Sequence, residues 1–199
     1  MRRKFLSILS ALLAAMLLTS TVFAGYIKLS NVTFSLGTDT STNSGGLQLM
    51  ALLAAESGQS SFPTLNATGT MTGLGKDDVI VQLQASGFPE VTCTNQGGNQ
   101  APGQNPPKVS SVGDQYLDGD ISETKNGKSP FNVTTDPADL GSLDAIAYGC
   151  PNDNWSAQIY FIYWTDATIT VFDLGGNELQ SQDYTCTTTL TSVTCKPVK

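Results

Sequence analysis

Acidic side chains gather in one stretch of the chain, 114–123, which reads DQYLDGDISE. Four of its carboxylates have a spacing close to that of a metal site: Asp114, Asp118, Asp120 and Glu123. Carboxylates arranged along a loop can surround Ca²⁺ with about seven oxygens, which makes calcium the cofactor that this stretch predicts. The spacing departs from the D-x-[DN]-x-[DN]-G pattern of calcium loops, so a solvated acidic loop is the alternative. If the site forms, calcium should raise the melting temperature.

Aromatic residues form a second candidate site in the segment 156–166, SAQIYFIYWTD. In a strand, Tyr160 and Trp164 would share one face with Gln158, because side chains alternate between the two faces. Aromatic rings on the face of a sandwich can stack on sugar rings, so these two residues are candidate ligand-binding residues. The alternative is that the apolar segment 47–56 covers them.

Residues for acid–base or nucleophilic catalysis are scarce. The sequence has no histidine, and it contains no G-x-S-x-G, G-x-x-x-x-G-K-[ST] or G-x-G-x-x-G motif. A pair of carboxylates could still serve a glycosidase. None of the four glutamates has a paired context in the sequence: Glu56, Glu90, Glu123 and Glu178. We therefore expect a protein that is not an enzyme, with a small glycoside hydrolase as a minor alternative.

The four cysteines predict two disulfides, because an even number in an exported chain usually pairs. They are Cys93, Cys150, Cys186 and Cys195. The last two flank TTTLTSVT, a run that could fold back as a hairpin and bring them together. We favour the pairs Cys93–Cys150 and Cys186–Cys195, although the sequence permits three pairings. With neither C-x-x-C nor histidine in the chain, metal binding by the thiols is disfavoured.

Residues 1–24 have the three parts of a secretory signal peptide. A basic start (MRRK) precedes the apolar run FLSILSALLAAMLL, and Val22 and Ala24 occupy the positions of an A-x-A-like cleavage site. The apolar run is short for a membrane anchor. Cleavage would leave 25–199 with seven lysines and seventeen acids, a net charge of −10. We expect a secreted protein that binds neither nucleic acid nor, after cleavage, a membrane.

The mature chain reads as a single domain, 25–199, made of short strands separated by turns. The prediction is an all-β fold, an antiparallel two-sheet sandwich of Ig-like or Greek-key type with about nine or ten strands. We place the strands at 26–36 (with a bulge near Asn31), 65–74, 78–85, 90–94, 108–112, 129–135, 156–166, 167–174, 178–187 and 192–196. Ser86–Pro89 is predicted as a turn, 95–107 as an irregular crossing loop, 114–128 as a polar stretch and 140–146 as a helical turn.

One insertion interrupts this strand pattern. Segment 38–64 begins with a polar loop and then carries LQLMALLAAE at 47–56, which contains strong helix formers and no β-branched residue. We expect a short buried helix there.

Three motifs, in this order, resemble those of a loose set of small exported bacterial proteins of unknown function. They are TGLG at 72–75, VTCTNQGGNQAPGQNP at 91–106 and CPNDNW at 150–155. The resemblance covers most of the mature chain and carries no activity with it. It implies a bacterial origin, so the four N-x-[ST] sequences need not carry glycans: Asn31, Asn66, Asn132 and Asn154.

From the sequence we therefore expect an extracellular, non-enzymatic interaction or binding module whose partner is a protein or a glycan. The alternative is a carbohydrate-binding or calcium-binding domain.

Overall fold

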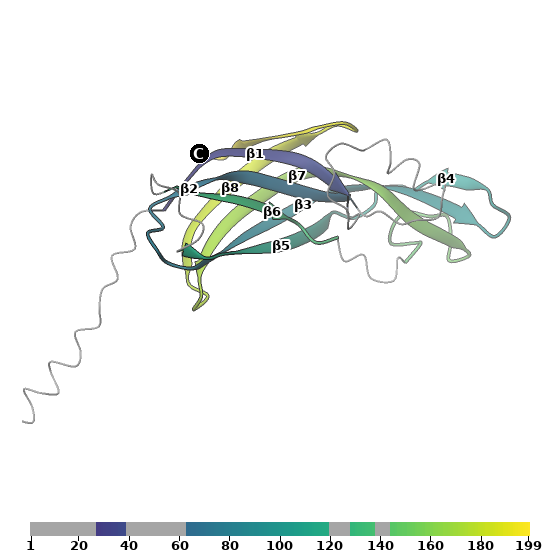
Figure 1. Ribbon diagram of the computed structural model, residues 1–199. Helices are drawn as coiled ribbons and strands as arrows, with labels where there is room; N and C mark the ends of the chain where they lie inside the picture. The colour runs from purple at the N-terminus through teal and green to yellow at the C-terminus, as the bar shows by residue number, and fades with distance from the viewer. Residues whose placement is uncertain (1–26, 39–62, 120–127, 138–143) are drawn as a thin grey trace, which may run out of the picture.

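The computed structural model describes residues 27–38, 63–119, 128–137 and 144–199 (Figure 1). All nine elements in these ranges are strands. No helix in the described part of the chain is long and apolar enough to cross a membrane.

The strands form two antiparallel sheets. Sheet A has the order β1-β2-β6, and sheet B has the order β4-β3-β7-β8-β9, with β5 also paired to β3. Their bounds are Lys28–Thr38 (β1), Pro63–Thr72 (β2), Val79–Asn95 (β3), Gln100–Pro102 (β4), Val109–Leu117 (β5), Lys128–Thr134 (β6), Trp155–Asp173 (β7), Glu178–Thr188 (β8) and Val193–Pro197 (β9). The chain changes sheet between β2 and β3, between β5 and β6 and between β6 and β7, which is a Greek-key arrangement. The predicted sandwich is confirmed.

The core lies between the facing surfaces of the two sheets. On β3, the alternating residues Val79, Val81, Leu83 and Ala85 are all at most 1% exposed. On the same face of sheet B, Ile169 of β7 is fully buried opposite Leu83. The period-2 alternation that predicts a strand here therefore also selects the side chains that fill the core.

The two sheets also meet along both sides. On one side, the ring of Phe34 in β1 packs edge-on against Tyr184 in β8, with centroids 4.9 Å apart. On the other side, the main-chain N–H of Asn132 in β6 donates a 2.7 Å hydrogen bond to the Gln115 side chain of β5. Gly113 permits that approach, because a Cβ there would lie 1.9 Å from the Thr134 carbonyl oxygen.

The bulge predicted near Asn31 is present. The register of β1 against β2 shifts between Ser30 and Thr33, and Asn31 has a positive φ of 53°. Asparagine tolerates this left-handed conformation better than most residues, so it can supply the extra residue of a bulge.

The predicted turn at Ser86–Pro89 is wrong, because β3 continues through it to Asn95. Gly87 is needed for close packing rather than for a turn: a Cβ there would lie 2.4 Å from the Tyr163 carbonyl oxygen of β7. Pro89 is tolerated because β4 pairs only with 92–94 and β5 only with 79–87, so no strand pairs with Pro89 on that edge of β3. The predicted break at 166/167 is also wrong, since β7 pairs with β3 along its whole length.

Two further predictions on this edge are corrected. The expected irregular loop 95–107 contains β4, which folds back on β3 through a turn in which Gly98 has a positive φ of 78°. The short strand expected at 108–112 runs on to Leu117, because Val109, Ser111 and Leu117 alternate inward and keep it in the sheet. The helical turn expected at 140–146 and the insertion helix at 47–56 lie mostly or wholly outside the described residues.

Both favoured disulfides are present, as Cys93–Cys150 and Cys186–Cys195. The second links directly opposed residues of β8 and β9. The first lies in the part of β3 and β7 that extends beyond sheet A, with β4 at its end (Figure 1). We call this part, residues 88–95, 100–102 and 155–163, the projecting ribbon, and we call residues 79–87 and 164–173 the sandwich half.

Candidate binding groove on the projecting ribbon

A bulge in β7 turns Tyr160 outward. Glu90 pairs with Phe161 and Val91 pairs with Ile159, so Tyr160 is an extra residue between the two pairs. Bulges re-aim side chains in this way. Tyr160 is 38% exposed, whereas its neighbours Ile159 and Phe161 are at most 9% exposed.

A groove of about 400 Å³ lies beside this bulge, in the size range of small-ligand sites. It occupies the stretch of the β3 edge that neither β4 nor β5 covers. Its walls mix proline and other apolar surface with a carboxylate, a hydroxyl and an amide. The lining residues are Pro89, Glu90, Val91, Thr92, Gln100, Ala101, Pro102, Gly103, Pro106 and Tyr160.

The groove is fixed from behind by main-chain contacts and a disulfide. Gly103 donates its N–H to the Val91 carbonyl oxygen at 2.9 Å, and Gln104 donates to that of Gly149 at 3.0 Å. Cys150, next to Gly149, is bonded to Cys93 of β3. A Cβ at Gly103 would lie 2.5 Å from the Tyr148 carbonyl oxygen, so the loop can pack this closely only with glycine there.

Among the described lining residues, Glu90 is the carboxylate, and a phenol orients it. Tyr163 donates a 3.0 Å hydrogen bond to Oε2 of Glu90. Burial first, and then the interaction with Glu90, raise the pKa of Tyr160 and of Tyr163 above the usual value. Both phenols therefore stay neutral, and Glu90 is held as an acceptor at the groove wall.

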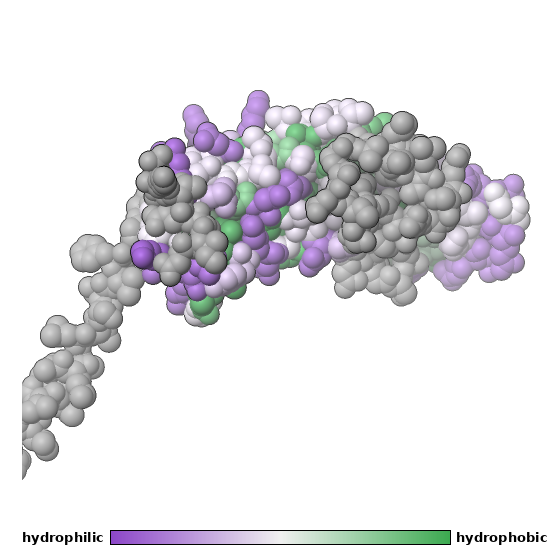
Figure 2. Space-filling view, in the orientation of Figure 1, coloured by the Kyte–Doolittle hydropathy of each residue, from purple (hydrophilic) through white to green (hydrophobic). Residues whose placement is uncertain are grey.

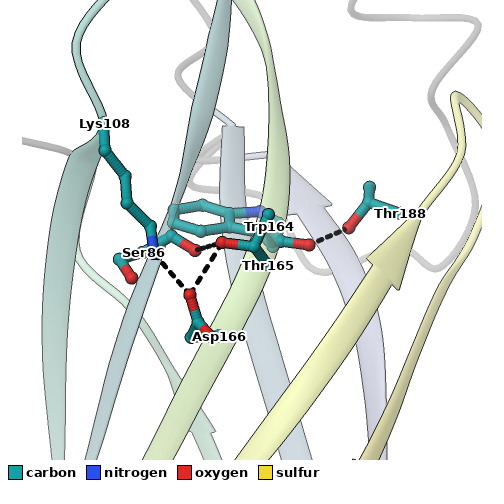
Figure 3. A network of polar contacts seen from close by, with 6 residues as sticks. All are labelled: Ser86, Lys108, Trp164, Thr165, Asp166 and Thr188. Atoms are coloured by element: carbon teal, nitrogen blue, oxygen red, sulfur yellow. Dashed lines mark hydrogen bonds and ion pairs between the residues drawn. The ribbon is translucent and has the colours of Figure 1, made fainter.

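A second carboxylate on the same outer face of sheet B already has a cation. Lys108 forms an ion pair with Asp166, and Thr165 donates to the same carboxylate at 2.8 Å (Figure 3). The Lys108 ammonium also lies 5.9 Å from the centroid of the Phe88 ring. The hydrogen bonds from Lys108 and then Thr165 lower the pKa of Asp166. Here an ammonium lies between a carboxylate and an aromatic face.

The prediction that Tyr160 and Trp164 share an exposed face is wrong. Trp164 is fully buried in the sandwich half, opposite Gly87. Regular alternation would put residues four apart on one face, but the extra residue Tyr160 breaks that alternation. Trp164 is held in the core, and its main-chain oxygen accepts a 2.8 Å bond from Thr188 (Figure 3). The proposed cover, 47–56, lies outside the described residues.

The calcium set is only partly described, because Asp120 and Glu123 lie outside the described residues. Asp114 lies on β5 and accepts a 3.0 Å hydrogen bond from Gln82. Asp118 follows the same strand, four residues on, which corresponds to about 13 Å in extended chain.

Within the residues described, no three acidic, cysteine or histidine side chains come together as metal ligands. The four-residue calcium site therefore stays a prediction.

The sequence reasoning missed Glu90 as a site residue. The side chains at positions 80, 82, 84 and 86 point outward on β3. If the strand continues beyond Ser86, the same alternation places Phe88 and Glu90 on this outer face. Treating Gly87 and Pro89 as turn residues removed Glu90 from that face.

Scans against protein-family models, curated proteins and solved structures gave no match to this chain.

Proposed function

We propose that this protein is an exported, non-enzymatic binding module that recognises an extracellular partner through the groove beside Tyr160. The observation that carries the proposal is a carboxylate, Glu90, which accepts a hydrogen bond from Tyr163 at the wall of a groove that bulged Tyr160 helps to line. Ligand sites are typically concave and combine apolar walls with a few oriented polar groups, and this groove has surface of both kinds.

Export is supported by two independent features. The basic and apolar start of the chain has the pattern of a cleaved signal peptide. The two disulfides are typical of an oxidising compartment, since cytosolic thiols are kept reduced.

A binding role fits the groove better than catalysis does. Glycoside hydrolysis needs two carboxyl groups about 5 to 9.5 Å apart, and Glu90 is the one carboxylate among the described lining residues. The phenols of Tyr160 and Tyr163 have raised pKa values and so are poor proton donors to a substrate at neutral pH.

A carbohydrate is the second candidate ligand. The exposed ring of Tyr160 lines the groove together with the hydroxyl of Thr92 and the amide of Gln100, which could bind sugar hydroxyls. Of the two residues predicted to stack on sugar rings, this candidate function includes Tyr160 but not the buried Trp164.

The test is binding of the mature protein to glycan and peptide arrays, comparing wild type with Tyr160→Ala and Glu90→Gln. We expect the groove variants to lose the array signal while their melting temperatures stay within a few degrees of wild type. Tyr116→Ala is the matched control, because Tyr116 is an exposed tyrosine on the outer face of sheet B, on β5 and outside the groove lining. Array binding that survives both groove variants would overturn the proposal.

A further inference from the structure

We infer that the groove receives a lysine side chain of a partner protein, with its ammonium against Glu90 and beside Tyr160. This rests on the proposed function and names the chemistry of the partner.

The molecule contains its own example of this arrangement. On the outer face of sheet B, the ammonium of Lys108 lies between the Asp166 carboxylate and the Phe88 ring. Glu90 has a similar setting, with a carboxylate and aromatic rings, but among the described residues no lysine pairs with it. Its hydrogen-bond partner there is the hydroxyl of Tyr163, and the exposed Tyr160 lines the same groove. Within the described ranges, Glu90 therefore has no counterpart of the ammonium that pairs with Asp166.

Lys108 cannot form an ion pair with Asp166 and with Glu90 at the same time. Asp166 pairs with Ser86, and Glu90 lies four residues further along β3, a separation of about 13 Å. Lys108 is already engaged with Asp166 and Phe88 (Figure 3). A carboxylate has two oxygens that can each accept more than one hydrogen bond, so the Tyr163 donor leaves Glu90 with capacity for further donors.

The negative charge of the protein favours a cationic ligand both at long range and in direct contact. The mature chain predicted from the sequence has a net charge of −10 and no arginine, so it attracts basic partners over about a Debye length. Close to the site, a lysine ammonium gains a charge-assisted hydrogen bond to Glu90 and a favourable position near an aromatic ring. The proline walls of the groove, Pro89, Pro102 and Pro106, match the apolar stem of a lysine side chain.

The open strand edge favours a protein source for this lysine over a free amine. Residues 88–90 pair with neither β4 nor β5, and next to them the Val91 carbonyl oxygen accepts the Gly103 N–H. An extended segment could lie along this edge while its lysine enters the groove, as in other cases where a peptide docks beside a sheet edge. The tip of the ribbon next to it is hydrophilic, at the right of Figure 2, where 96–100 is exposed.

The test uses the mature protein and calorimetric titration with a blocked five-residue peptide, Ac-TSKST-NH2. Its matched control has norleucine in place of lysine, which keeps the stem and removes the charge. We expect the lysine peptide to bind about tenfold more tightly, and raising the ionic strength from about 0.02 M to about 0.5 M to weaken it several-fold. Glu90→Gln should abolish the preference, whereas Asp166→Asn should leave it intact.

The outcomes separate this inference from the proposed function. Equal affinity for the lysine and norleucine peptides, or a lysine preference that survives Glu90→Gln, overturns the lysine site. If the lysine site is overturned but Tyr160→Ala still abolishes binding of a neutral glycan, the groove binds a ligand other than lysine and the proposed function stands. If butylammonium binds as tightly as the peptide, the protein source is overturned. Unchanged melting curves of Glu90→Gln show that any loss is not due to unfolding.

Discussion

Strands β3 and β7 are each one continuous strand, but their two halves are held in different ways. The sandwich half is buried against sheet A, and its inner face carries side chains that are at most 2% exposed: Val79, Val81, Leu83, Ala85, Trp164, Ala167, Ile169 and Val171. The projecting ribbon lies beyond sheet A and is held by a disulfide, the 144–150 turn and the loop after β4. The same two strands thus form part of the core in the sandwich half and support the candidate binding groove in the projecting ribbon.

The difference is also visible in the two bulges of β7. In the sandwich half, the extra residue Thr165 donates to Asp166 and lies 3.3 Å from the Ser86 carbonyl oxygen, so the bulge is closed by internal bonds. In the ribbon, the extra residue Tyr160 lines an open groove. A bulge therefore forms internal hydrogen bonds in the sandwich half, whereas in the projecting ribbon a bulge presents a side chain to the groove.

The largest effect is expected from removing the disulfide that holds the ribbon. The paired change Cys93→Ser with Cys150→Ser should cost about 4 kcal/mol of unfolding free energy, because the bond closes a long loop. Cys186→Ser with Cys195→Ser should cost about 2.7 kcal/mol, since the loop is shorter. Urea denaturation gives both values. Hydrogen exchange should show lost protection in 88–95 and 155–163 for the first pair only, and equal loss throughout the molecule would contradict two separately held halves.

A matched pair of isoleucines in β7 compares the halves directly. Ile169 is fully buried in the sandwich half, and Ile159 is 6% exposed in the ribbon. We expect Ile169→Ala to destabilise the protein by about 4 kcal/mol and Ile159→Ala by about 2 kcal/mol, because the less enclosed site can relax around the missing atoms. Thermal and urea melts measure the difference. A larger cost at Ile159 would mean that the ribbon is the better packed half.

The smallest effect concerns the internal ion pair. Asp166 is 54% exposed at its side chain, so Asp166→Asn should cost only about 0.5 kcal/mol at pH 7. The pKa of Asp166 is lowered in the folded protein, so its contribution is present above the unfolded pKa and is lost as the pH falls through the folded value. The stability difference between the two proteins should therefore shrink as the pH falls through the folded pKa of Asp166 and vanish well below it. A difference in unfolding free energy that persists in acid would show that the mutation acts through packing.

The sequence predicts the sheets well because alternation, turn residues and cysteines are local signals. The bulge at Asn31 and both disulfides follow from such signals, and all are present. The lengths of β3 and β7 do not follow from them. Gly87 and Pro89 carry strong turn chemistry that is overridden by pairing with β7, a contact between residues far apart in the chain.

The site was harder to predict for the same reason. Exposure of Tyr160 and burial of Trp164 depend on bulges that appear only when β7 is aligned against β3. The role of Glu90 depends on Tyr163 across the strand pair and on the stretch of β3 left open between β4 and β5. None of these relations is a spacing within one segment, so no periodicity in the sequence reports them.

The most direct measurement is an amide chemical-shift map of ¹⁵N-labelled mature protein titrated with the lysine peptide. If the projecting ribbon carries recognition, the shifts that move belong to Glu90, Thr92, Gln100 and Tyr160, and they stay still when Glu90→Gln is titrated in the same way. Shifts that move instead on the outer face of sheet A, around Thr33 and Thr68, would place recognition on the opposite side of the molecule and contradict the account.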